Sequence, residues 1–108
     1  MKSRLASTTG LPAETIERIQ QVFAAHPEIE RVCLYGSRAK GDYRDGSDID
    51  LAIMGDALSP GSLPGIVNEL DDLLLPYKID LCLFHQIENA DLVAHIQRVG
   101  VDFFRRKP

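Results

Sequence analysis

The sequence lacks the features that would place it in a membrane, across a secretory pathway or along a long nucleic acid. No apolar run approaches the length needed to cross a bilayer. The polar start, residues 1–10, has no apolar stretch of the kind found in secretory signals. The 12 basic residues are outnumbered by 16 acidic ones and are spread along the chain, so a surface for gripping a long nucleic acid is not expected. We therefore expect a cytoplasmic protein with no membrane segment.

Metal-binding spacings of cysteine and histidine are also missing. Cys33 and Cys82 are the two cysteines; they lie within β-prone runs, and we expect them to be buried free thiols. His26, His85 and His95 show no ligand spacing and are expected to be structural or surface residues.

With 108 residues, the chain is long enough for one domain with a core and too short for a second, substrate-binding domain. Residues 1–10 are polar without periodicity and are expected to form a flexible tail, which leaves 11–108 as the domain. Hydrophobic spacing and turn residues predict an alternating order of elements: helix 12–25, strand 31–35, strand 48–54, helix 62–75, strand 78–84, helix 89–98 and strand 101–104. This order is typical of an α/β or α+β layered domain.

Two of the predicted strands carry aspartates among apolar residues. Because side chains alternate along a strand, Asp48 and Asp50 point to one face and Ile49 and Leu51 to the other. Asp80 lies in the middle of an apolar strand and can join that face if the strands are neighbours. Three such carboxylates repel one another unless cations lie between them, and hard divalent ions bound together with substrate phosphates are the usual solution.

A simpler interpretation is that Asp48 and Asp50 only begin a strand, with Asp45-Gly46 as the preceding turn. Asp80 weakens this alternative, because an acid inside an apolar strand has poor β-propensity and no turn to explain it.

The segment GSRAKG, residues 36–41, is rich in groups that suit a phosphate. Gly36 follows a strand and permits close approach of a ligand to the backbone, while Ser37 begins a short helical turn and offers a hydroxyl and N–H groups to an anion. Arg38 and Lys40 are candidate phosphate ligands, and the alternative is that they are solvated loop charges. The glycine interval matches a P-loop, but the Lys and Ser/Thr of that motif are absent. The segment also fails as a calcium-binding EF-hand loop.

Together, Gly36-Ser37, the later Asp48-Ile49-Asp50 and the still later Asp80 resemble the DNA polymerase beta-like nucleotidyltransferase superfamily. More closely, the segments LYGSRAKG, SDIDLAI, KIDLCLF and HIQRVG resemble the minimal nucleotidyltransferases that often accompany HEPN-type toxins. The resemblance implies a mixed β-sheet of about four strands flanked by helices. It also implies that Asp48, Asp50 and Asp80 bind two Mg²⁺ ions as the catalytic and metal-binding residues. Gly36 and Ser37 would bind the phosphates of the nucleotide.

The function implied by this resemblance is transfer of AMP from ATP to a tyrosine hydroxyl of a small helical HEPN-type partner, in the role of an antitoxin. Two alternatives remain: an antitoxin that masks its toxin by binding alone, and a transferase for a small molecule. Because the chain has no room for an acceptor-binding domain, we expect a protein partner and an assembly of two or more chains.

Overall fold

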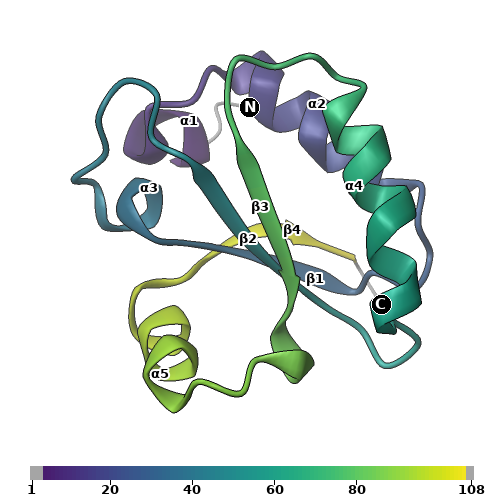
Figure 1. The fold of residues 1–108 in the computed structure, drawn as a ribbon. Helices are drawn as coiled ribbons and strands as arrows, with labels where there is room; N and C mark the ends of the chain where they lie inside the picture. The colour runs from purple at the N-terminus through teal and green to yellow at the C-terminus, as the bar shows by residue number, and fades with distance from the viewer. Residues whose placement is uncertain (1–3, 107–108) are drawn as a thin grey trace.

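The backbone is built around a single four-stranded sheet with strand order β3-β2-β1-β4 (Figure 1). The computed structural model describes residues 4–106. The strands are β1 (Arg31–Tyr35), β2 (Ile49–Met54), β3 (Ile79–Leu83) and β4 (Val101–Arg105). Strand β1 is antiparallel to β2 and β4, whereas β2 and β3 are parallel. The predicted mixed sheet is confirmed.

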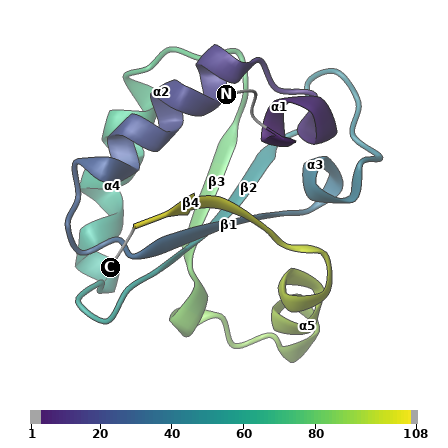
Figure 2. The same ribbon diagram turned by 180° about the vertical axis from the view of Figure 1, so that it is seen from behind.

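Helices cover both faces of this sheet. They are α1 (Arg4–Thr9), α2 (Ala13–Ala24), α3 (Ser37–Lys40), α4 (Leu63–Asp71) and α5 (Ala90–Val99), with short 3₁₀ turns at Pro60–Ser62 and Phe84–Gln86. Helices α2 and α4 lie side by side on one face, and α5 stands apart from them near the opposite face (Figures 1 and 2). Within residues 4–106, no helix is both long and apolar enough to span a bilayer.

The alternation of side chains along β2 divides the core in two. Ile49, Leu51 and Ile53 are fully buried in the larger cluster, which α2 and α4 cover. Ala52 belongs to the smaller cluster, together with Ile96 of α5. Asp50 has the parity of Ala52, so its side chain is on the α5 face.

The N-terminal segment differs from the expected flexible tail. Residues 4–9 form helix α1; Leu5 packs against the larger cluster, and Thr9 is 1% exposed. Gly10 ends this helix with φ of +74°, a conformation that favours glycine. Six residues are too few to show a helical periodicity, which is why the sequence pattern did not indicate this helix. Residues 1–3 of the expected tail lie outside the described residues.

The predicted helix 62–75 is shorter than expected. Helix α4 ends at Asp71, and Leu74 has φ of +56° and is 87% exposed. The apolar spacing of the predicted helix 62–75 places Leu74 on one face with Ile66 and Leu70, and this prediction is wrong for Leu74. The helical spacing that pointed Leu74 inward no longer applies once the chain has left the helix.

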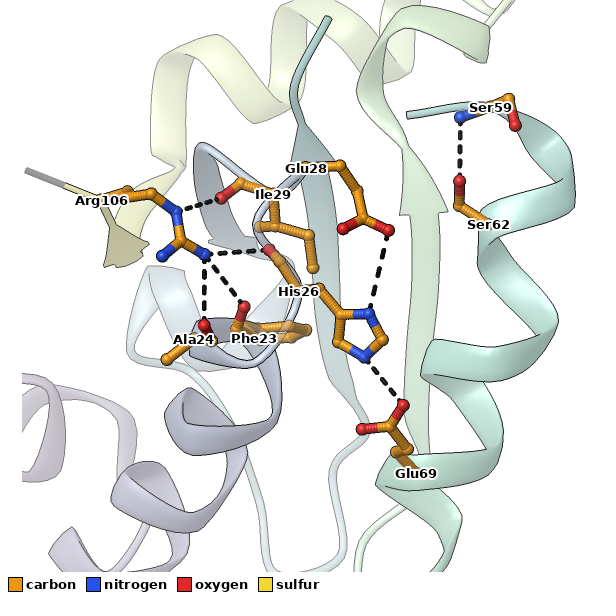
Figure 3. A network of polar contacts seen from close by, with 9 residues as sticks. All are labelled: Phe23, Ala24, His26, Glu28, Ile29, Ser59, Ser62, Glu69 and Arg106. Atoms are coloured by element: carbon orange, nitrogen blue, oxygen red, sulfur yellow. Dashed lines mark hydrogen bonds and ion pairs between the residues drawn. The ribbon is translucent and has the colours of Figure 1, made fainter. Parts of the chain in front are cut away.

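A polar network joins the ends of α2, α4 and β4 (Figure 3). Arg106, directly after β4, donates hydrogen bonds to the carbonyl oxygens of Ile29, His26 and Phe23 at 3.0, 2.9 and 3.3 Å. The His26 Nε2 atom lies 2.8 Å from a carboxylate oxygen of Glu69 on α4. The last strand is therefore fastened to the C-terminal end of α2, away from the aspartate-bearing end of β2.

Candidate active site

Two of the three predicted aspartates lie directly opposite each other. Asp50 and Asp80 are register partners across the parallel pair β2 and β3, so their side chains share the α5 face. Asp48 is exposed and directly precedes β2. Burial raises the pKa of Asp50 above its ordinary value, and the charges of Asp80 and Asp48 and a hydrogen bond to Asp80 raise it further. We expected all three carboxylates to converge. This is confirmed for Asp50 and Asp80, whereas no gathered group of three such side chains is found among residues 4–106. The catalytic and metal-binding roles of the three aspartates stay predictions.

Gly36 brings the end of β1 against the Asp50 carboxylate. Its φ is +78°, and a Cβ atom placed on it would collide with Oδ2 of Asp50. Ser37 begins α3 in the next position. The predicted phosphate turn and the predicted carboxylates are therefore adjacent in space, because Tyr35, the last residue of β1, is the register partner of Asp50.

Arg38 has a different place from the one expected. We expected its guanidinium to contact phosphate, but its side chain turns inward and is 2% exposed. The guanidinium donates hydrogen bonds to the carbonyl oxygens of Ser47 and Thr9 and lies near the rings of Tyr43 and Tyr77. Because the buried guanidinium faces these internal partners, we leave Arg38 out of the proposed nucleotide site.

Lys40 remains available to solvent. Its side chain is 47% exposed, and its Nζ atom lies 3.4 Å from Asp42. An exposed ion pair of this kind is weak and easily exchanged. The role of Lys40 as a phosphate ligand stays a prediction.

His95 lies near the carboxylates, which sequence reasoning missed. From α5 its ring makes an edge contact with Tyr35, with ring centroids 6.2 Å apart, and its charge acts to lower the pKa of Asp50. Tyr35 is half-buried; burial, followed by a hydrogen bond with Cys82, raises its pKa well above the ordinary value. The available signal was helical spacing, since His95 directly precedes the inward-facing Ile96. His85, by contrast, lies beyond the end of β3 that is farther from Asp80.

The oxygen donors of this site suit a hard cation, since carboxylates are ligands that Mg²⁺ accepts. Asp50 and Asp80 supply adjacent carboxylates whose mutual repulsion a cation would relieve. Over the described part of the chain, no group of three or more His, Cys, Asp or Glu side chains is already gathered as a metal site. The residues therefore fit such an ion in chemistry, and the ion itself belongs to the proposal below.

A protein-family comparison decides the class of this domain. The model for "Polymerase beta, Nucleotidyltransferase" matches residues 17–108. The chain belongs to this nucleotidyltransferase family. A search of curated proteins gives no match to this nucleotidyltransferase.

Solved structures share the fold of this nucleotidyltransferase at low sequence identity. A chain of a toxin–antitoxin crystal structure with AMP-PNP is 20% identical, with a TM-score of 0.68, over 85% of this chain and 74% of that one. A chain of the complex of tri-AMPylated Shewanella oneidensis HEPN toxin with MNT antitoxin is 18% identical, with a TM-score of 0.64, over 86% and 71% of the two chains. A chain of the toxin–antitoxin MntA–HepT is 18% identical, with a TM-score of 0.65, over 88% and 74%.

Proposed function

We propose that this nucleotidyltransferase transfers AMP from ATP to a tyrosine hydroxyl of a small helical HEPN-type protein and thereby acts as an antitoxin. The observation that carries the proposal is the pairing of Asp50 with Asp80 beside the Gly36-Ser37 turn. The similar folds in a toxin–antitoxin structure with AMP-PNP and in a complex with an AMPylated HEPN toxin support both the nucleotide and the kind of acceptor.

The reaction is an in-line displacement at the α-phosphorus. The acceptor oxygen forms a bond to this phosphorus, the bond to the bridging oxygen of pyrophosphate breaks, and the hydroxyl proton is released. Asp48, Asp50 and Asp80 would hold two Mg²⁺ ions, which when bound lower the pKa of the acceptor hydroxyl and stabilise the leaving pyrophosphate. Gly36 allows close approach of the triphosphate, and Ser37 orients it by hydrogen bonding. Lys40 would add a positive charge near the phosphates.

The roles of the aspartates can be separated by substitution. We expect Asp80→Asn to keep most of the ATP affinity and to lose transfer by orders of magnitude, because Asp80 would serve the ion that activates the acceptor. Asp102→Asn is a matched control. Asp102 is also a strand aspartate, but it lies on β4 and forms ion pairs with Arg31 of β1 and Arg105 of β4. This variant should transfer like the wild type.

The measurement is intact mass of a co-purifying small helical protein after incubation with ATP and Mg²⁺. Addition of an adenylyl group by the wild type, but not by Asp80→Asn, supports the proposal. Undiminished transfer by Asp80→Asn would refute the role of Asp80. Absence of transfer by the wild type, with the complex intact, would favour an antitoxin that acts by masking alone.

A further inference from the structure

The Arg38 guanidinium lies where the separate segments of the candidate site meet. Arg38 follows Ser37 in α3, so its backbone belongs to the phosphate turn. Its Nε atom donates to the Ser47 carbonyl oxygen at 3.1 Å, and Ser47 directly precedes Asp48. A single side chain thus joins the turn that would hold the triphosphate to the backbone that places the first aspartate.

The same guanidinium also reaches the segment that leads to Asp80. Its central carbon lies 5.0 Å from the ring centroid of Tyr77, just before β3, and 5.2 Å from that of Tyr43 in the loop 41–48. Both distances are within the range of cation–π attraction. The two rings therefore hold the cation between the loop before β2 and the loop before β3.

A third connection comes from outside the region matched by the family. The Thr9 carbonyl oxygen, at the end of α1, accepts a hydrogen bond of 2.8 Å from Nη1 of Arg38, and the family match begins only at residue 17. The Tyr43 ring lies directly against Gly10, where a Cβ atom would collide with it. Helix α1 thus contacts Arg38 directly through Thr9, and Gly10 contacts the Tyr43 ring that lies beside Arg38.

The burial of this cation requires an explanation. A charged side chain is costly to bury unless its hydrogen bonds are satisfied, and Arg38 takes part in none of the ion pairs found among residues 4–106. Carbonyl oxygens and ring faces take the place of a carboxylate. A guanidinium suits this arrangement because its planar donors point in fixed directions, which a lysine ammonium cannot reproduce.

We propose that Arg38 is a positioning residue that fixes the Ser37 turn relative to Asp48 and Asp80. Contacts with Thr9, Tyr43 and Tyr77 hold its side chain, and α1 contributes to them through Thr9. The inference rests on the proposed function for its effect on transfer. The effect on the loop does not depend on it. We call the contacts of Arg38 with Thr9, Ser47, Tyr43 and Tyr77 the Arg38 clamp. A misplacement of the reacting groups by about 1 Å lowers the rate of an enzyme by roughly 100-fold. Loss of the Arg38 clamp should therefore affect turnover before it affects folding.

Substitutions by residues of similar size test the clamp. Arg38→Lys keeps the charge but loses the planar donors. Arg44→Lys is its control, because it makes the same chemical change at an exposed residue of the neighbouring loop 41–48. Tyr77→Leu removes the aromatic ring near the guanidinium, whereas Tyr77→Phe keeps the ring and removes only the hydroxyl group. Tyr77→Leu also keeps the test decisive if Arg38→Lys does not fold.

The first readout is hydrogen–deuterium exchange of the backbone amides of residues 41–48 in metal-free protein. We expect faster exchange there in Arg38→Lys and Tyr77→Leu, wild-type exchange in Arg44→Lys and Tyr77→Phe, and no change in strand β1. Folded Arg38→Lys with wild-type exchange over 41–48 would overturn the proposal.

The second readout is steady-state transfer of AMP. We expect kcat of Arg38→Lys and Tyr77→Leu to fall roughly 10- to 100-fold, with a smaller change in KM for ATP, and Tyr77→Phe to recover the rate. A wild-type kcat in folded Arg38→Lys would also overturn the positioning role. If the wild type transfers no nucleotide, the proposed function fails, and the exchange comparison still decides whether the clamp exists.

Discussion

Gly36 has two independent reasons to be glycine. Its φ of +78° is costly for any other residue, and an added Cβ would strike the Asp50 carboxylate. We expect Gly36→Ala to destabilise the protein by about 2 kcal/mol or more and to abolish transfer, because the Asp50 side chain must move. Urea denaturation and the intact-mass assay measure the two effects.

The neighbouring loop supplies the control for this substitution. Gly46 has a similar φ of +83°, but a Cβ atom there would meet nothing within 4 Å. Gly46→Ala should therefore show only the backbone cost, about 1 kcal/mol, and retain transfer. Equal losses of activity in both variants would show that the contact with Asp50 does not matter.

At the scale of single residues, the sequence predicts a side chain well where its direction is set by its own strand. The alternation in β2 and the apolar surroundings of Asp80 predicted that Asp50 and Asp80 share a face if their strands are neighbours, and the parallel pairing of β2 and β3 meets that condition. The place of Arg38 could not be predicted in this way. Its partners, Thr9 and Tyr77, are far from it in sequence, so only the tertiary fold decides whether the guanidinium turns inward.

Helix α5 lies on the same face as the candidate site, and its first turn depends on one cap. The Asn89 side-chain oxygen accepts hydrogen bonds from the backbone N–H groups of Asp91 and Leu92 at 2.8 and 3.2 Å. We expect Asn89→Ala to lower the free energy of unfolding by about 1 kcal/mol and to speed amide exchange in the first turn of α5. Urea denaturation and hydrogen exchange test this.

The isosteric control for this cap is Asn89→Asp, which keeps an oxygen acceptor at the helix N-terminus. It should unfold at nearly the wild-type urea concentration. A loss in Asn89→Asp as large as that in Asn89→Ala would mean that the cap is not the source of the stability.

At the scale of elements, the strands were predicted closely because periodicity and turn residues act locally. Strand β1 has the expected bounds, and β3 is shorter by one residue at each end. Helix α1 was not predicted, because its six residues depend on packing by Leu5 and Ala6 rather than on a pattern of their own.

At the scale of the whole molecule, Arg106 connects the end of β4 to the C-terminal end of α2 and the segment after it. Its guanidinium donates hydrogen bonds to the carbonyl oxygens of Phe23, His26 and Ile29 (Figure 3). Arg106→Ala removes the side-chain donor of the Ile29 carbonyl group, whereas the carbonyl oxygens of Phe23 and His26 keep backbone N–H donors. We expect a loss of about 2 kcal/mol in stability. Arg105→Ala is the control, since its ion pair with Asp102 is exposed and should contribute less than about 1 kcal/mol. Chemical denaturation compares the two variants.

The same variants should bind ATP like the wild type. Arg105 is the register partner of Arg31, at one end of β1. Tyr35, the register partner of Asp50, is at the other end of that strand. The measurement is the rise in melting temperature on adding ATP and Mg²⁺. A rise that differs between Arg106→Ala and the wild type would show that substitutions at this end of the sheet affect ligand binding at the site.

The parallel pairing of β2 and β3 has a consequence for protein synthesis. The antiparallel strands β1 and β2 are close in sequence, so the ribbon that carries Asp50 can form early on the ribosome. Asp80, however, reaches its place beside Asp50 only after α4 and β3 have left the exit tunnel. The crossover between β2 and β3 thus determines the earliest moment during translation at which Asp80 can lie beside Asp50.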